Sequence, residues 1–203
     1  MILKTLCWTL LLFGSSLSVA ASSPTPAPTP ALTPSGTPKP STSAPVPTDL
    51  SGVKVLEVGQ GGVHQAGLIV YNAQKYGLPP AGGPHNPIWQ NCGVYARPVA
   101  NEYAVHALEH GVVWIAYRPG LPSTVIDKLR AAVRGNPRVI LAPYPKLPAQ
   151  VVATAWGVQK RYNSYGAEVG RFMALYSSEE GSKAPEFGAT CQGGASDADS
   201  RQR

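Results

Sequence analysis

The sequence predicts a single compact α+β domain with a largely mixed or antiparallel sheet and about three helices. The chain has 203 residues, but its first 49 are of low complexity or resemble a targeting segment, which leaves the length of one domain. Its composition, 43% hydrophobic and 14% charged, is apolar enough to form one core. Strand-like and helix-like segments then follow one another without an internal repeat.

The first 21 residues have the pattern of a secretory signal peptide. Lys4 gives a positive start, residues 6–13 are apolar, and small residues around Ala20 fit a cleavage site. This apolar run is well short of the roughly 20 residues that span a bilayer. We therefore expect an extracytoplasmic protein, whether periplasmic, on the cell surface or secreted. It would contact the membrane only if the signal is retained as an anchor.

Residues 22–49 consist almost entirely of Pro, Thr, Ser and Ala. This composition predicts a disordered, extended linker, because proline removes backbone donors and little of the segment can be buried. The globular domain is predicted over residues 50–194. The polar residues 195–203 are predicted to be a disordered tail.

The first half of the domain shows little regular structure. Residues 53–58 alternate as a strand does, and residues 67–71 form a second short apolar run. Residues 77–98 are rich in Gly and Pro and predict a long loop. A loop of that length in a compact domain is usually functional or cross-linked.

The second half of the domain has clearer periodicity. A helix is predicted over residues 101–110 with Asn101 as N-cap, and another over residues 123–133 with Ser123 as N-cap. A third helix is predicted over residues 166–176. Three apolar runs predict buried strands over residues 112–117, 139–142 and 151–156.

Two cysteines remain once the signal, with Cys7, is removed. An oxidising compartment favours a disulfide between Cys92 and Cys191 over two free thiols, or over Cys92 as a metal ligand or nucleophile. The net charge of +6 comes from scattered Lys and Arg residues. Without a basic cluster, nucleic-acid binding is not predicted.

The histidines carry the functional prediction. His106 and His110 are four residues apart on a predicted helix, so both imidazoles leave the same face, which is how a helix presents two nitrogen ligands to one ion. His85 lies in the long loop, and His64 follows two glycines. We predict that His85, His106 and His110, with His64 as a possible fourth ligand, bind Zn(II) or Cu(II). The alternative is that these side chains only pack and cap the helix.

Glu109 raises a second hypothesis. Residues 106–110 fit the His-x-x-Glu-His pattern of inverted zinc metallopeptidases, in which the Glu activates water. That reading makes Glu109 the catalytic base of a zinc hydrolase, but it also needs a downstream carboxylate ligand. Glu168, Glu179, Glu180 and Glu186 are the candidates. A third hypothesis is a metal-free interaction module of the cell envelope. The sequence favours a binding protein over an enzyme.

Several segments in this order resemble one bacterial family. They are Pro79-Pro80-Ala81-Gly82-Gly83-Pro84-His85, Cys92-Gly93-Val94-Tyr95, Val105-His106-Ala107-Leu108-Glu109-His110-Gly111, Thr154-Ala155-Trp156-Gly157, and the late Pro185-Glu186 with Cys191-Gln192-Gly193-Gly194. Together, over about residues 55–194, they resemble domain of unknown function 3105. Ala81-Gly82 stands where that family usually has Thr-Ser. The resemblance implies an exported or membrane-attached bacterial domain and supplies no reaction.

Overall fold

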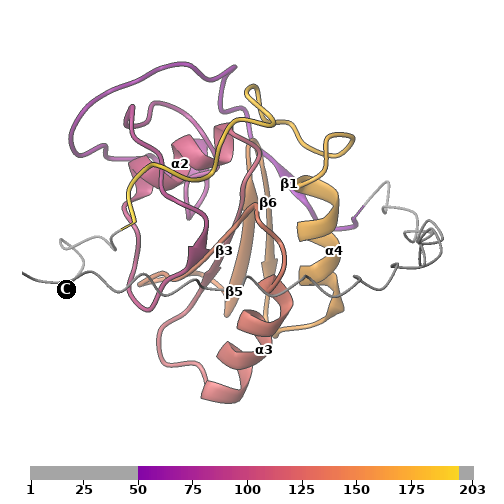
Figure 1. Cartoon of the computed structure of the whole chain (residues 1–203). Coiled ribbons are helices and arrows are strands. Elements are labelled where there is room, and N and C mark those ends of the chain that lie inside the picture. Colours follow the sequence, from indigo (N-terminus) through magenta and orange to yellow (C-terminus); the bar gives the residue numbers. More distant parts are fainter. Residues whose placement is uncertain (1–49, 197–203) are drawn as a thin grey trace, which may run out of the picture. The chain divides into compact units, whose positions relative to one another are not determined.

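A mixed β-sheet forms the centre of the domain in the computed structural model, which describes residues 50–196 (Figure 1). Within that range the sheet has six strands in the order β1-β6-β5-β3-β4-β2. The strands are β1 (Lys54–Val55), β2 (Gly93–Val94), β3 (Val113–Tyr117), β4 (Val139–Pro143), β5 (Val151–Ala155) and β6 (Val158–Tyr162).

The central strand β3 makes the sheet mixed. It pairs in parallel with β4, Val113 opposite Val139, and antiparallel with β5, Trp114 opposite Thr154. The parallel pair is joined through a helix, as parallel strands require. β5 and β6 form a hairpin whose two-residue turn contains Gly157 with φ 67°, a left-handed conformation that favours glycine.

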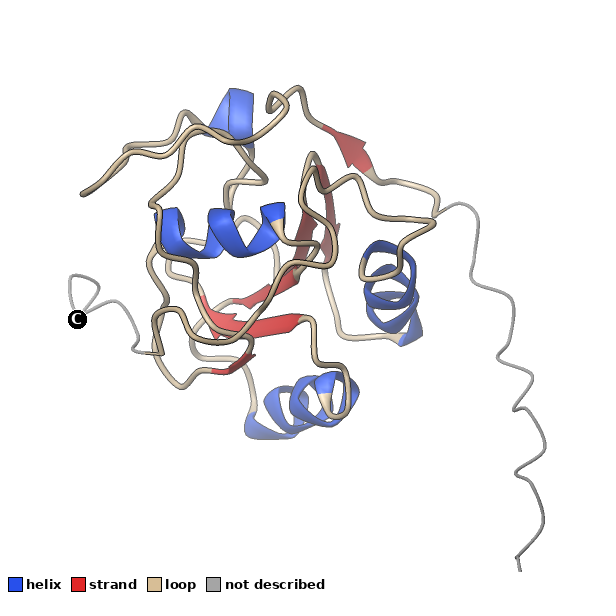
Figure 2. Cartoon of the chain, turned by 45° about the horizontal axis from the view of Figure 1, so that its top comes forward, coloured by secondary structure: helices blue, strands red, loops and turns tan. Residues whose placement is uncertain are grey.

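Helices cover both faces of the sheet (Figure 2). The helices in the described range are α1 (Ala73–Tyr76), α2 (Asn101–Glu109), α3 (Ser123–Val133) and α4 (Ala167–Tyr176). α3 and α4 pack on the face that includes Ile115, whereas α2 packs on the face that includes Trp114. Side chains of β3 thus alternate between two cores, as the pleat dictates.

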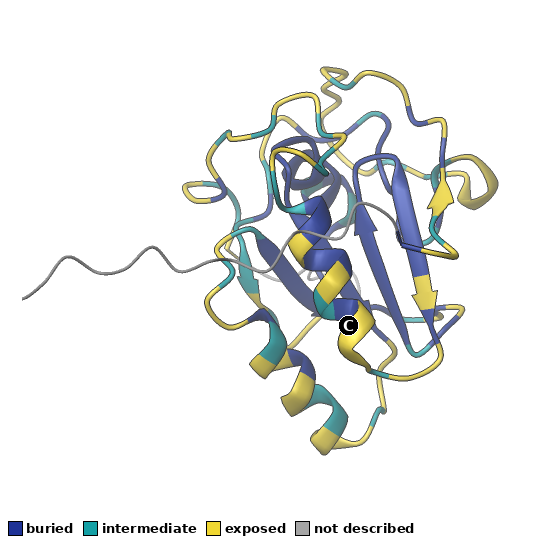
Figure 3. Cartoon of the chain, turned by 90° about the vertical axis from the view of Figure 1, so that its right-hand side faces the viewer, coloured by how far each residue is buried: buried dark blue, intermediate teal, exposed yellow. Residues whose placement is uncertain are grey.

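The two helical layers differ in exposure. α3 and α4 keep exposed outer faces (Figure 3), whereas seven of the nine residues of α2 are buried. Ala104 and Leu108 of α2 belong to the core against the sheet. Loops cover the other side of α2, and this second cover is what encloses the polar residues of the helix.

The predicted α+β class and mixed sheet are confirmed, but several local predictions are wrong. Residues 67–71 form no strand; Leu68 and Val70 are 66% and 90% exposed, so this apolar run has no core to enter. β6 is not among the predicted strands, because its polar residues hide the strand pattern although Gln159 and Lys160 are buried by neighbouring segments.

Helix caps and strand lengths also differ from the predictions. The N-cap residues of α2 and α3 are Ala100 and Pro122, one position before Asn101 and Ser123. β1 extends only over Lys54–Val55 because residues 56–59 leave the sheet as loop.

Part of the sequence prediction lies beyond the described range. The predicted signal peptide (1–21), the linker (22–49) and residues 197–203 of the predicted tail (195–203) lie outside the described residues. Within residues 50–196, no helix is both long and apolar enough to cross a membrane.

Candidate metal centre

Three ionisable side chains lie on one buried face at the C-terminal end of α2, where His110 is the C-cap residue. His106, Glu109 and His110 are spaced i, i+3 and i+4, so they leave the helix on one side. Their exposed fractions are 4%, 0% and 4%. Burying three such polar groups side by side costs folding free energy unless each has hydrogen-bond partners or ligands.

Two loop histidines meet the helix from outside. His64 and His85 form an isolated parallel β-bridge, in which the His85 backbone N–H donates to the Val63 carbonyl at 3.0 Å. The bridge holds the buried ring of His85 and the exposed ring of His64 with centroids 5.0 Å apart. Backbone pairing therefore joins two residues that are 21 positions apart in the chain (85 − 64 = 21).

The four imidazoles form one continuous cluster. The His106 ring lies 4.9 Å from that of His64, 4.8 Å from that of His85 and 4.7 Å from that of His110, measured between centroids. Trp89 covers the cluster, with its ring 5.6 Å from His106 and 5.1 Å from His110. His106 is thus the common neighbour of the other three.

Backbone carbonyls fix the tautomer of the three buried histidines. A carbonyl oxygen only accepts, so each Nδ1 that contacts one must carry the proton. Each Nε2 atom then bears the free lone pair of the neutral ring, the arrangement found in histidine ligands of metals. The bonds are His85 Nδ1 to Gly83 O at 2.9 Å, His106 Nδ1 to Asn86 O at 2.6 Å and His110 Nδ1 to Thr190 O at 2.7 Å.

Glu109 contributes a buried carboxylate to this cluster. Its Oε1 accepts from the Gly62 backbone N–H at 2.5 Å. Its Oε2 lies 2.9 Å from His85 Nε2, and neither of these two buried atoms has a hydrogen-bond partner in good geometry. Two lone-pair atoms that face each other away from water require a cation, either a proton or a metal ion.

The approach of the Gly62 loop to Glu109 requires a glycine at position 61. Gly61 has φ 91°, and a Cβ atom there would clash with Glu109 Oε1 and Pro185. The left-handed backbone and the lack of side chain together let the loop lie against the carboxylate.

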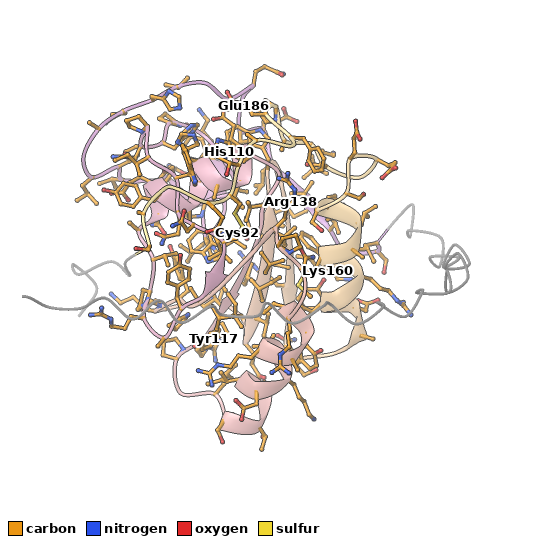
Figure 4. The ribbon with its side chains drawn as sticks, in the orientation of Figure 1. Cys92, His110, Tyr117, Arg138, Lys160 and Glu186 are labelled. Atoms are coloured by element: carbon orange, nitrogen blue, oxygen red, sulfur yellow. A yellow bond between two sulfur atoms is a disulfide. The ribbon has the colours of Figure 1, made fainter. Side chains whose placement is uncertain are left out.

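Glu186 brings a second carboxylate to the other end of the cluster. It is 50% exposed at its side chain, and its Oε2 lies 3.6 Å from His110 Nε2. Its backbone N–H donates to the Glu109 carbonyl at 3.0 Å, which ties the C-terminal segment to the end of α2. Figure 4 shows His110 and Glu186 at the same end of the molecule as α2.

The Cys92–Cys191 disulfide holds that segment in place. The two residues are 99 positions apart and their Cα atoms lie 5.5 Å from each other. Cys191 directly follows Thr190, whose carbonyl orients His110. Arg138 adds a second tie, because its guanidinium donates to the carbonyls of His110, at 2.9 Å, and Ala189, at 3.3 Å.

Burial keeps His106 neutral. Removal from water, together with the neighbouring imidazoles of His110, His85 and His64, lowers the pKa of His106 to about 4 against the opposing effect of the hydrogen bond to the Asn86 carbonyl. Its Nε2 lone pair is therefore available near pH 7.

The ligand atoms of this cluster fall into two overlapping groups. One contains His64, His85, His106 and Glu109, and the other contains His106, His110 and Glu186; within each, the atoms lie within 4.8 Å of one another. All four predicted histidines therefore come together, but His85 and His110 belong to different groups.

Several parts of this arrangement do not follow from local patterns in the sequence. The sequence pattern offers Glu109 as a catalytic base, or as a helix-end carboxylate paired with a base, and Glu186 as one of four downstream carboxylates. No sequence pattern indicates the carbonyl acceptors or the cover by Trp89. One signal was present: Glu186 lies five residues before Cys191, so a bridge to Cys92 would draw it toward the loop that holds His85.

The fold and the cluster define an α+β domain with a buried imidazole–carboxylate centre. The family model described as Protein of unknown function (DUF3105) matches residues 64–193, a range that includes all four histidines and both bridged cysteines. The chain belongs to this family. No curated protein and no solved structure matches it.

Proposed function

We propose that this protein is an extracytoplasmic metal-binding protein that takes Zn(II) or Cu(II) through its histidine cluster. The observation that carries the proposal is the shared tautomer of the three buried histidines: each donates its Nδ1–H to a backbone carbonyl, which leaves Nε2 as the lone-pair atom of the neutral ring. Nε2 of His85 and of His110 each faces a carboxylate oxygen, at 2.9 and 3.6 Å, and not a hydrogen-bond donor. A cluster that served only for packing would gain more if hydrogen-bond donors satisfied these Nε2 atoms, or if apolar side chains replaced the imidazoles.

The donor set favours Zn(II) and Cu(II). Imidazole nitrogens with one carboxylate suit these ions, whereas Mg²⁺ and Ca²⁺ prefer oxygen ligands throughout. The thiols of Cys92 and Cys191 are bonded to each other, and Met173 is buried in the core on the opposite face of the sheet. Soft sulfur ligands, which would favour Cu(I), are thus not part of the cluster. The signal pattern and the bridged cysteines support the extracytoplasmic location.

Metal analysis of the exported chain tests this proposal. The protein is stripped with a chelator, dialysed against Zn(II) or Cu(II), and analysed by mass spectrometry for bound metal. We expect one ion per chain, lost in His106→Ala, which removes the residue common to both groups, and retained in the control Glu179→Gln, an exposed carboxylate outside both groups. A chain that binds neither ion would instead support a metal-free polar network.

One observation favours a second candidate, a zinc hydrolase. Glu186 joins His106 and His110, so two histidines of the His-x-x-Glu-His pattern and a downstream carboxylate meet as that chemistry requires. Against it, Glu109 is fully buried, with Oε1 bound to Gly62 and Oε2 against His85, which leaves no contact for a reacting water. In a hydrolase, Glu109→Gln would abolish turnover and retain metal; in a binding protein, it weakens metal binding.

A further inference from the structure

The two overlapping groups of ligands share a single residue, and this sharing limits what they can do. We call His64, His85, His106 and Glu109 the inner site, and His106, His110 and Glu186 the outer site. We infer that they are two alternative positions of one ion, which rests at the inner site and is exchanged with donors and acceptors through the outer site. This inference rests on the proposed metal binding and extends it to metal transfer.

The bonding of His106 makes the two sites mutually exclusive. Its Nδ1 donates to the Asn86 carbonyl at 2.6 Å and is not available as a ligand. The ring then has one lone pair, on Nε2, and one lone pair binds one ion. Two ions cannot both have His106 as a ligand, so full occupation gives one ion per chain.

The inner site has the stronger donor set. It offers three imidazoles and a carboxylate, the four ligands of a closed tetrahedral site. Glu109 is wholly buried and its Oε2 has no hydrogen-bond partner, so an ion there replaces no bond to water. Charge neutralisation by a buried carboxylate is worth most where solvent is excluded.

The outer site is open by comparison. It offers three ligands and therefore leaves a fourth position for a group from outside. Its carboxylate, Glu186, is half exposed and stands 3.6 Å from His110 Nε2, so it can reach both the buried pair of histidines and the solvent. A ligand atom of an acceptor molecule can therefore bind the ion at this fourth position before the protein's own ligands leave the ion.

Transfer through His106 allows ligands to be exchanged one at a time. An ion that keeps its bond to His106 can replace His85 by His110 and Glu109 by Glu186, because the His106 ring lies 4.8 Å from His85 and 4.7 Å from His110. Direct escape past the exposed His64 would instead break the bonds to His85, His106 and Glu109 without replacements. The path through Glu186 has the lower barrier.

Exchange kinetics with a chelator test the inference. The exported chain is loaded with Zn(II), and release to excess 4-(2-pyridylazo)resorcinol is followed by absorbance; uptake is measured in reverse, and affinity by competition at equilibrium. We expect Glu186→Gln to slow both release and uptake by about tenfold and to leave affinity nearly unchanged, because it raises a barrier without altering the resting site. Glu109→Gln should lower affinity by about 10- to 100-fold.

The controls separate this inference from the metal-binding proposal itself. Glu179→Gln removes an exposed carboxylate outside both sites and should leave release and uptake unchanged. Binding of two ions per chain, unchanged rates in Glu186→Gln, or slow exchange in His64→Ala instead would overturn the transfer path and leave metal binding intact. If the wild-type chain binds no metal, both the transfer path and the metal-binding proposal are wrong.

Discussion

Substitution of His106 by alanine should remove the whole stabilisation that a metal ion gives to this domain. His106 is the common member of both ligand groups, so neither group keeps its full set without it. The readout is the difference in melting temperature between metal-saturated and metal-free protein, measured separately for each variant by calorimetry. This difference isolates binding from any effect on the fold alone.

The expected size follows from linkage between binding and folding. An ion present at one hundred times its dissociation constant stabilises the folded chain by about 2.7 kcal/mol. For a domain of roughly 150 residues, each kcal/mol raises the melting temperature by about 2–4 °C, so the wild type should gain about 5–10 °C. The metal-free variant should lose about 1–3 kcal/mol, since the buried Asn86 carbonyl loses its donor.

Two comparisons make this test decisive. Val169 lies in the core on the opposite face of the sheet. Val169→Ala should therefore lower the melting temperature of the metal-free protein but leave the increase in melting temperature caused by metal unchanged. His64→Ala should keep part of the shift, because an exposed ligand can be replaced by water. If His106→Ala retains more than half of the wild-type shift, the assignment of His106 as the shared ligand is wrong.

Three further predictions follow from contacts around the cluster. Replacing both Cys92 and Cys191 by serine should lower the free energy of unfolding by about 2–5 kcal/mol in urea titrations. It should also slow metal transfer, because the segment that carries Glu186 is no longer held by the disulfide; an unchanged transfer rate would contradict this. Gly61→Ala should reduce metal affinity by about 10- to 100-fold in competition assays, because the Cβ of the new alanine displaces the Glu109 carboxylate. If the variant binds metal as tightly as the wild type, this contact does not position Glu109. In metal-free protein, the pKa of His106 falls from 6.5 in the unfolded chain to about 4 in the folded one. The unfolded chain therefore binds more protons between these values, so stability is lost as pH falls from about 6.5 to 4, by up to about 3 kcal/mol. His106→Ala should flatten this loss, and an identical pH profile would argue against it.

Local patterns in the sequence predicted part of the site. The spacing of His106 and His110 placed both on one helix face, because a helix repeats every 3.6 residues. The meeting of His64 with His85 could not be predicted in this way, since it depends on a β-bridge between two irregular loops. The same limit hid β6, whose polar residues are buried only because other segments cover them.

The three Nδ1 acceptors in the cluster are all main-chain carbonyls, those of Gly83, Asn86 and Thr190. Every residue type carries such a carbonyl, so most side-chain changes at positions 86 and 190 should leave the orientation of the imidazoles intact. A change in loop length is different, because inserting or deleting one residue between 83 and 86 moves two acceptors at once. Relatives that conserve this centre should therefore vary in residue identity along these loops and agree in the number of residues.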